Sequence, residues 1–184
     1  LGVDGIDDLT KEQLTPILLY HVVGAKVKST DLTNGYVTTL STGPGNKNVS
    51  LKVDATNLEL NGGVGITSAD INATNGVIHV VDKVLLPPTV VDIALDNDNF
   101  SILVSALVKA ELVETLKGDG PFTVFAPTND AFNALFEALD VTGIADLSKE
   151  ALTPILLDHV VSGNVRSTDL TTGSVNTLNN SISI

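Results

Sequence analysis

Residues 1–23 read LGVDGIDDLTKEQLTPILLYHVV, and residues 139–161 read LDVTGIADLSKEALTPILLDHVV. The same register continues, since Ser29–Thr33 matches Ser167–Thr171, and about two thirds of the first 40 positions agree at a constant offset of about 138 residues. A repeat this long is a domain rather than a solenoid unit, which spans only about 20–50 residues. The chain therefore carries parts of two similar domains.

Neither copy of the repeat is complete. The first copy continues to Pro88, whereas the second stops at Ile184, where Ser181–Ile184 resembles Asn48–Val53. Residues 90–138 precede the second copy and have no counterpart ahead of Leu1, so we expect a fragment of a longer protein. Consecutive prolines in Leu85–Thr89 hold the chain extended and favour a boundary there. We expect residues 1–89 to be the C-terminal part of one domain and residues 90–184 the N-terminal part of the next.

Local patterns place helices and short strands along the chain. Three helices are expected: from the capping box Thr10–Gln13 to about His21, from a cap at Asp98 or Asn99 to Gly118, and after a cap at Thr128. Strands are expected at Val49–Val53, Leu58–Leu60, Val77–Val81 and Phe122–Phe125, with turns at Asn61–Gly63 and Asn75–Gly76. Because strands and helices do not alternate regularly, this mixture predicts the α+β class.

The chain is acidic and poor in aromatic residues. Ten Lys and Arg against 22 Asp and Glu give a net charge of −12, which repels phosphate backbones and anionic lipids. Nucleic acid is therefore not expected as a partner, and acidic membrane surfaces are poor candidates. The absence of cysteine rules out disulfide and thiolate chemistry, and no apolar run is long enough to cross a bilayer. With 43% hydrophobic and 4% aromatic residues, a globular core must consist of Leu, Val, Ile and Ala with a few Phe.

Three motifs resemble those of the fasciclin domain family. Residues 120–132, GPFTVFAPTNDAF, are similar to its first signature box, and residues 75–88, NGVIHVVDKVLLPP, are similar to its second. Residues 17–23, ILLYHVV, resemble the tyrosine–histidine box that lies between them. Together with the repeat, the three motifs cover essentially the whole chain. The resemblance implies a wedge-shaped β-sandwich with packed helices, which occurs in tandem in secreted and cell-surface adhesion proteins.

The order of the motifs departs from the family pattern, because here the second box precedes the first. One interpretation is two incomplete repeats in tandem. The other is that residues 91–138 supply the missing front half of residues 1–90, either as a circularly permuted domain or by domain swapping between two chains. Without that complement, the strand Val77–Val81 would expose an apolar edge.

The resemblance also implies contact segments for adhesion. In animal fasciclin repeats, the tyrosine–histidine box and an Asp-Ile pair ahead of the second box are implicated in binding integrins. By position these are Tyr20 and His21, and Asp70 and Ile71; in the second copy His159 matches, but an aspartate stands in place of the tyrosine. Losing the ring removes apolar area and a hydroxyl from the second site. For any single one of these residues, packing or capping is the simpler interpretation.

Histidine is the first side chain to test for catalysis, because its pKa lies near neutrality. His21, His79 and His159 are each flanked by apolar residues, which favours partly buried rings bonded to the main chain. A triad of Ser29, His21 and Asp31 can be imagined, but no G-x-S-x-G sequence supports it. We expect no enzymatic activity, and a secreted hydrolase that uses a histidine is the alternative.

The segment Asp96–Asn99 is the best candidate for a calcium loop. It begins like an EF-hand, but Ser101 occupies the position of the required glycine and Leu107 that of the closing glutamate. Helix capping explains the segment better, so we expect no metal and no cofactor.

These observations predict an extracellular adhesion module that is secreted or held at the cell surface, or periplasmic if the source is bacterial. Its expected partners are cell-surface or matrix proteins, or a polysaccharide, and self-association through a domain-swapped dimer is a further expectation. Weak contacts of single repeats would be compensated by tandem copies that raise the effective concentration. A purely structural spacer repeat has the same core and is the second alternative.

Overall fold

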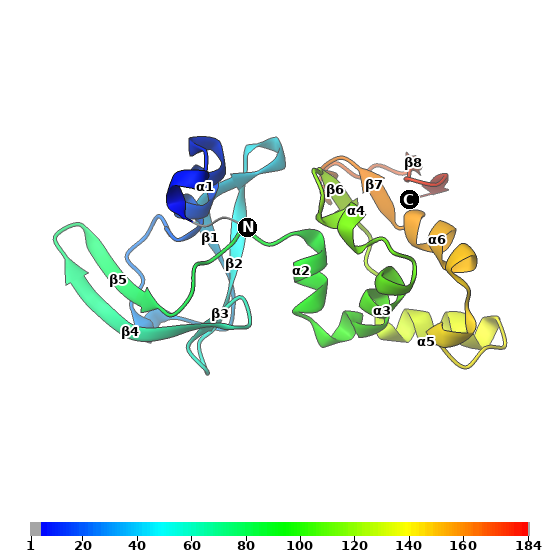
Figure 1. The fold of residues 1–184 in the computed structure, drawn as a ribbon, viewed down its shortest axis with the longest axis horizontal. Helices are drawn as coiled ribbons and strands as arrows, with labels where there is room; N and C mark the ends of the chain where they lie inside the picture. The colour runs from blue at the N-terminus through cyan, green and yellow to red at the C-terminus, as the bar shows by residue number, and fades with distance from the viewer. Residues whose placement is uncertain (1–4, 184) are drawn as a thin grey trace. The chain divides into compact units, whose positions relative to one another are not determined.

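The computed structural model describes residues 5–183. The chain folds into two compact units that divide between Pro87 and Pro88 (Figure 1). Each unit has its own cluster of buried apolar side chains.

The first unit consists of one helix and a five-stranded antiparallel sheet in the order β1-β2-β3-β4-β5 (Figure 1). Its elements are a 3₁₀ turn Ile6–Asp8, α1 Lys11–Tyr20, a 3₁₀ turn Ser29–Asp31, β1 Gly35–Gly43, a 3₁₀ turn Pro44–Asn46, β2 Lys47–Asp54, β3 Glu59–Leu60, β4 Val64–Ala73 and β5 Gly76–Val81. The sheet bends between the β1–β2 pair and the β4–β5 hairpin (Figure 1).

Local sequence explains where α1 begins. The hydroxyl of Thr10 accepts from the backbone N–H of Gln13 at 3.3 Å, and the Gln13 side chain accepts from the backbone N–H of Thr10 at 3.0 Å. This reciprocal pair satisfies two N–H groups that a helix start leaves without partners. Pro16 lies inside the helix without ending it, and His21 forms the C-cap.

Alternation of apolar residues explains the packing of the central strands. Leu51 and Val53 of β2 and Leu60 of β3 point to one side and form a buried cluster with Tyr20 and Leu85. A strand with this period of two turns alternate side chains to the core. The cluster fixes the sheet against the C-terminal end of α1.

The second unit is mainly helical and carries two small sheets, β6-β7 and β8-β9 (Figure 1). Its elements are α2 Val90–Leu95, a 3₁₀ turn Asp98–Phe100, α3 Ser101–Lys109, α4 Val113–Lys117, β6 Phe122–Val124, α5 Asn129–Ala138, a 3₁₀ turn Ile144–Asp146, α6 Lys149–Leu157, β7 Val160–Ser162, β8 Ser174–Asn176 and β9 Ser181–Ser183. Its buried cluster joins residues of α3, α5, α6 and β7: Leu103, Ala106, Leu107, Phe132, Phe136, Leu152, Leu156 and Val160.

Most of the elements expected from sequence are present. The cap of Thr128 on α5 is confirmed, since its hydroxyl accepts from the N–H of Ala131 at 3.3 Å. The four expected strands correspond to β2, β3, β5 and β6, and the turn at Asn61–Gly63 joins β3 to β4. The other turn lies one residue earlier than expected, because Ala73 pairs with Gly76.

The expected second helix from Asp98 to Gly118 is wrong in two respects. Asp98 starts a separate 3₁₀ turn, and the N-cap of α3 is Phe100. The helix also breaks after Lys109, where Glu111 has a positive φ of 59°, and α4 follows as a separate element. An L-residue in that conformation interrupts the hydrogen-bond ladder of a helix.

The structure contains both sheets and packed helices without regular alternation, which confirms the α+β class. None of the helices among the described residues combines the length and apolar character needed to cross a membrane.

Candidate adhesion surface

Asp70 lies at an irregularity of β4 and joins three segments of the first unit. The pairing of β4 with β5 shifts register between Ser68 and Ile71, and Asp70 itself has a positive φ of 61°. One carboxylate oxygen accepts from the backbone N–H of Ser29 at 2.9 Å, and the other accepts from the Ser29 hydroxyl. These hydrogen bonds from Ser29 hold the pKa of the Asp70 carboxyl below its ordinary value, because they favour the charged form.

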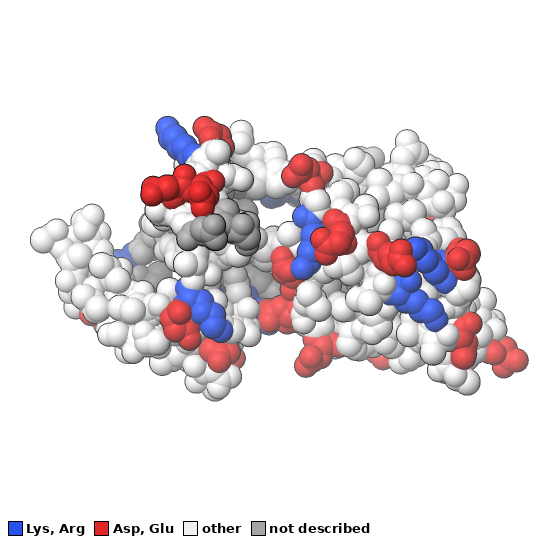
Figure 2. All heavy atoms as spheres, viewed as in Figure 1, with Lys and Arg blue, Asp and Glu red and all other residues white. Residues whose placement is uncertain are grey.

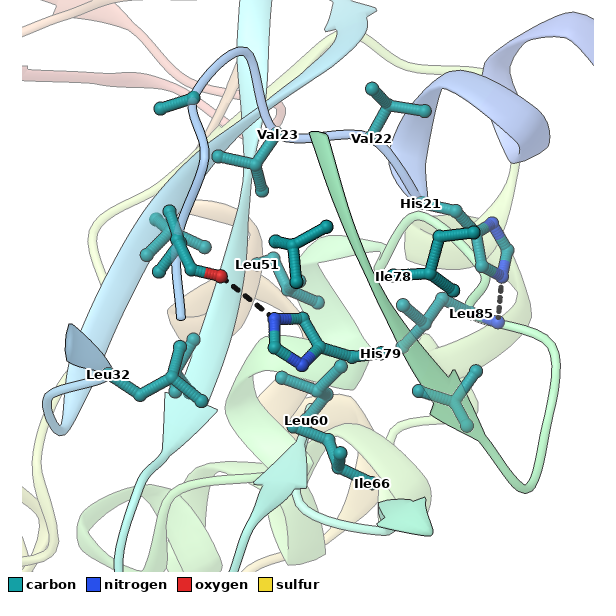
Figure 3. Close-up of a pocket in the computed structure, with 16 residues that line it drawn as sticks. His21, Val22, Val23, Leu32, Leu51, Leu60, Ile66, Ile78, His79 and Leu85 are labelled. Atoms are coloured by element: carbon teal, nitrogen blue, oxygen red, sulfur yellow. Dashed lines mark hydrogen bonds between the residues drawn. The ribbon is translucent and has the colours of Figure 1, made fainter. Parts of the chain in front are cut away.

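His79 strengthens the same junction from β5. Its Nδ1 accepts from the backbone N–H of Asp70 at 3.4 Å, and its Nε2 lies 2.9 Å from the carbonyl oxygen of Val27 (Figure 3). The neutral tautomer with the proton on Nε2 satisfies both contacts. Asp70 and His79 therefore fasten the segment Val27–Ser29 to the β4–β5 hairpin, and the hairpin is held in one position.

The hairpin presents aliphatic side chains to solvent beyond this junction. Ile71 pairs with Ile78 across the two strands, and these side chains are 46% and 55% exposed. Val80, two residues further on the same face of β5, is also exposed. We call Ile71, Ile78 and Val80 the hairpin patch.

The hairpin patch is uncharged although the chain is strongly acidic. Residues 71–81 contain no Asp, Glu, Lys or Arg. Figure 2 shows the end of the hairpin in white, whereas acidic and basic side chains are scattered over the rest of the visible face. Exposed apolar side chains that are gathered on a fixed element are typical of sites for protein partners.

Tyr20 does not reach the surface. Its side chain is 0% exposed; the hydroxyl donates to the carbonyl oxygen of Ser50 at 2.9 Å and accepts from the Asn61 side-chain amide at 3.0 Å. Burial raises the pKa of the Tyr20 phenol. The ring packs against β2 and β3, so a direct contact between Tyr20 and a partner is incompatible with this structure, and the residue stabilises the core.

His21 and His159 hold the ends of their helices. In each, Nδ1 lies 2.8 Å from the carbonyl oxygen four residues earlier, Ile17 for His21 and Ile155 for His159. Nε2 of His21 also accepts from the backbone N–H of Leu85 at 2.9 Å (Figure 3). The two main-chain contacts of His21 and the one of His159 explain a histidine at these positions without a bound ligand.

A cavity of about 440 Å³ lies within the first unit (Figure 3). Its walls are mainly apolar and include Leu32, Leu51, Ile66 and Leu85, with His21 and His79 beside them. Because the ring nitrogens of both histidines are engaged with the main chain, neither supplies a base to the cavity.

The imagined triad of Ser29, His21 and Asp31 is not assembled. The Ser29 hydroxyl donates to Asp70, and the Asp31 carboxylate accepts from the backbone N–H of Lys28 at 3.3 Å. The Ser29 hydroxyl therefore bonds to Asp70 and not to His21, whose ring nitrogens contact the main chain at Ile17 and Leu85, so the serine–histidine contact of a triad is not formed.

The acidic segment ahead of α3 is organised by its own side chains. The Asn97 side chain accepts from the backbone N–H of Asn99 at 3.1 Å, and the Asn129 side chain donates to the carbonyl oxygen of Asp98 at 2.9 Å. Within residues 5–183, no three or more His, Asp or Glu side chains gather as metal ligands would.

Comparison with known proteins agrees with this architecture. The family model of the fasciclin domain matches residues 3–87 and again residues 98–183. Protein sll1483 of Synechocystis sp. is 44% identical over 90 residues, which are 49% of this chain and 50% of that protein. Transforming growth factor-beta-induced protein ig-h3 of Sus scrofa is 37% identical over 136 residues, 73% of this chain and 19% of that protein. Human periostin is 32% identical over 71% of this chain and 16% of its own length.

This chain thus spans half the length of the cyanobacterial relative and a small part of the mammalian ones. A solved FAS1 domain pair from the insect cell adhesion molecule fasciclin I superposes with a TM-score of 0.49 at 20% identity, covering 97% of this chain and 69% of that one. Since the family model matches twice and covers most of the sequence, the chain carries two fasciclin-type repeats in tandem. It belongs to the fasciclin domain family.

Proposed function

We propose that this chain is an extracellular adhesion module, and that the hairpin patch of the first unit is its contact surface for a protein at a cell surface or in the matrix. The observation that carries the proposal is the exposed pair Ile71 and Ile78 on a hairpin fixed by Asp70 and Ser29. Rigid presentation matters because a surface that is already ordered loses less entropy on binding.

The chemistry of the patch favours a protein over a polysaccharide. Branched aliphatic side chains bury apolar area against a partner, but they offer no hydrogen bonds to sugar hydroxyls. Residues 71–81 also contain no charged side chain, so an apolar partner surface can pack on them without burying a charge. Of the five residues suggested by the family resemblance, Asp70 positions this surface and Ile71 forms part of it.

A cell-attachment assay tests the proposal directly. Surfaces coated with the 184-residue chain are offered to cultured fibroblasts and to Synechocystis cells, and the attached cells are counted under flow. Ile78→Ser should lower attachment by about five- to tenfold, the usual loss when an anchoring side chain is removed. Val108→Ser, a matched change of an exposed aliphatic residue in α3, should leave attachment unchanged.

Pretreatment of the cells identifies the class of partner. Proteolysis of surface proteins should abolish attachment, whereas periodate oxidation of glycans should not. Loss of attachment after periodate alone would assign the contact to a polysaccharide, and no attachment to either cell type would favour a spacer repeat.

A further inference from the structure

The first unit contains three Asn-Gly pairs. The tripeptide Thr-Asn-Gly occurs at residues 33–35 and again at residues 74–76, and the third pair is Asn61 and Gly62. Asparagine is chemically labile, above all where glycine follows it, because a glycine without Cβ lets its backbone nitrogen approach the side-chain amide carbon. All three pairs carry the same reactive groups, so any difference in reactivity must come from the structure around them.

The Asn61 side chain is held by the core of its unit. Its amide nitrogen donates to the Tyr20 hydroxyl at 3.0 Å, and its amide oxygen accepts from the backbone N–H of Lys52 at 3.1 Å. Deamidation needs a side chain that can rotate onto the nitrogen of the following residue, and both hydrogen bonds oppose that rotation. Asn61 is therefore protected.

Asn34 is exposed, but its side chain is also bound. Its amide oxygen accepts from the backbone N–H of Ala55 at 2.8 Å, and its amide nitrogen donates to the Thr56 hydroxyl at 3.4 Å. These contacts tie the residue before β1 to the turn after β2. Asn34 must lose both hydrogen bonds before it can react.

Asn75 is exposed, and its side chain makes no hydrogen bond to any group among residues 5–183. It lies in the turn between β4 and β5, at the free end of the hairpin (Figure 1). Gly76 pairs with Ala73 in the last pair of this ladder, and terminal pairs open most readily. The reacting groups are therefore less restrained here than in the other two pairs.

We propose that Asn75 is a deamidation site, and that its conversion to an acid changes the hairpin patch with time. The Gly76 nitrogen bonds to Cγ of Asn75 and gives up its proton, and the amide nitrogen of Asn75 leaves with that proton as ammonia. A water molecule then adds to one of the two carbonyl carbons of the cyclic imide, and the imide nitrogen takes a proton from the water. Opening at Cγ gives aspartate, and opening at the main-chain carbonyl gives isoaspartate.

Both products place a carboxylate in the segment that carries the hairpin patch. Residues 71–81 have no charged side chain, so the new carboxylate would be their first charge. An apolar partner surface that closes over the patch would have to remove water from this group, which weakens binding. This consequence rests on the proposed function of the hairpin patch.

Isoaspartate has a second effect, because its main chain runs through the side-chain carbon and is one atom longer. Thr74 and Asn75 form the turn that closes a ladder in which Ile71 faces Ile78. Turn length fixes the register of a hairpin, so a longer turn disturbs that pair. Conversion of Asn75 therefore changes both the charge and the geometry of the patch.

Peptide mapping by mass spectrometry measures the modification. The 184-residue chain is incubated at mildly alkaline pH, and the acid formed at each asparagine is followed with time. Asn75 should convert about tenfold faster than Asn34, because Asn34 must first give up its hydrogen bonds. In urea the two should convert at the same rate, since both lie in the tripeptide Thr-Asn-Gly.

Gly76→Ala is the variant that blocks the reaction. A Cβ added at Gly76 would meet no atom within 4 Å, and Gly76 does not have a positive φ, so the hairpin accommodates alanine. The added methyl group obstructs the approach of the nitrogen to Cγ. Gly76→Ala should therefore slow the conversion of Asn75 and leave that of Asn34 unchanged.

The fibroblast attachment assay measures the consequence for the patch. Asn75→Asp should lower attachment by about three- to tenfold, because it places a charge beside the apolar contact. Asn34→Asp makes the same change of charge in the same tripeptide and should leave attachment unchanged. After incubation, the unmodified chain should lose attachment and Gly76→Ala should keep it.

Equal conversion of Asn34 and Asn75 in the folded chain would overturn the assignment of the site. An intact Asn75 in the folded chain, where the chain in urea converts, would do the same. Unchanged attachment of Asn75→Asp together with a loss for Ile78→Ser would overturn the effect on the patch. If the fresh unmodified chain attaches no cells, the proposed function fails, whereas the mass spectra still decide whether Asn75 is modified.

Discussion

The segments Lys11–His21 and Lys149–His159, which contain α1 and α6, have nearly the same sequence, KEQLTPILLYH and KEALTPILLDH, but different surroundings. Both begin with a hydroxyl cap, Thr10 at 3.3 Å from the N–H of Gln13 and Ser148 at 3.2 Å from that of Ala151. In both, the histidine lies 2.8 Å from the carbonyl oxygen four residues earlier. Leu156 is nevertheless buried, while the equivalent Leu18 is exposed.

The comparison separates local from tertiary effects. Caps and the histidine contact use groups within five residues of each other, so both repeats form them. Burial depends on α3 and α5, which pack against α6 in the second unit. The same leucine can therefore stabilise one unit strongly and the other hardly at all.

The two segments differ at the C-terminal end of the helix, where Tyr20 is replaced by Asp158, and this difference also follows from tertiary packing. Tyr20 fills the core of the first unit, whereas the equivalent Asp158 accepts from the hydroxyl of Thr177 at 3.0 Å near the surface. Each residue fits the sheet beside it, since β2 and β3 bury an aromatic ring and the short β8–β9 pair does not.

The largest effect on stability is expected when the equivalent leucines of the two repeats, Leu18 and Leu156, are each replaced by alanine. Leu156→Ala should lower the free energy of unfolding of the second unit by about 2–4 kcal/mol, because it leaves a cavity in a packed cluster. Leu18→Ala should change that of the first unit by less than about 0.5 kcal/mol, because the side chain is already exposed.

Urea unfolding followed by two probes measures both changes. Both tyrosines, Tyr20 and Tyr36, lie in the first unit, so tyrosine fluorescence reports on that unit, and far-ultraviolet circular dichroism reports on both. Equal losses for Leu18→Ala and Leu156→Ala would contradict the prediction, because the two leucines differ in exposure, 55% against 1%.

A smaller effect is expected at the helix end. Tyr20→Phe leaves the Ser50 carbonyl and the Asn61 amide without their buried partner, which should cost about 1–2 kcal/mol. Asp158→Asn keeps an acceptor for Thr177 and should be nearly neutral. Loss of amide-exchange protection in β2 and β3 for Tyr20→Phe alone would support this difference; equal loss in both variants would contradict it.

The smallest effect is expected in a titration. The pKa of Asp70 is lowered in the folded chain by the hydrogen bonds from Ser29. This contribution to stability is present above the ordinary pKa and is lost as the pH falls through the folded pKa. Ser29→Ala should therefore raise the pKa of Asp70 toward its ordinary value, measured from the carboxyl carbon resonance by NMR.

Ser167→Ala is the matched control in the second repeat. It changes the residue equivalent to Ser29, but the partner equivalent to Asp70 would lie beyond position 184. The Asp70 titration should be unchanged in this variant. A shift in both variants, or in neither, would show that Ser29 does not determine the pKa.

Prediction from sequence succeeded where a signal is local. The capping box at Thr10, the cap at Thr128 and the alternation in β2 and β5 are each contained in a few residues, and the structure has each of them. The break between α3 and α4 was missed because apolar spacing continues through Glu111, and only its positive φ reveals the interruption.

The candidate site was predictable only in part. The family resemblance indicated Asp70 and Ile71, and the structure adds Ser29, His79 and Ile78, which sequence spacing does not connect to them. Tyr20 was equally indicated but is buried, because its ring packs on strands about 30 to 40 residues further along the chain. The burial of Tyr20 depends on contacts with Ser50 and Asn61, which no pattern in the neighbouring sequence indicates.

The sequence by itself determined the repeat, the α+β class, the helix caps and the three family motifs, because each depends on residue identity within a short window or on direct comparison of two stretches. The tertiary structure decided which copy of each apolar residue is buried, since burial is a property of whatever packs against it. It also decided that Tyr20 is internal and that Ile71 and Ile78 are exposed on a fixed hairpin. Identical side chains acquire different roles because the free energy of burial depends on the partner surface and not on the residue alone.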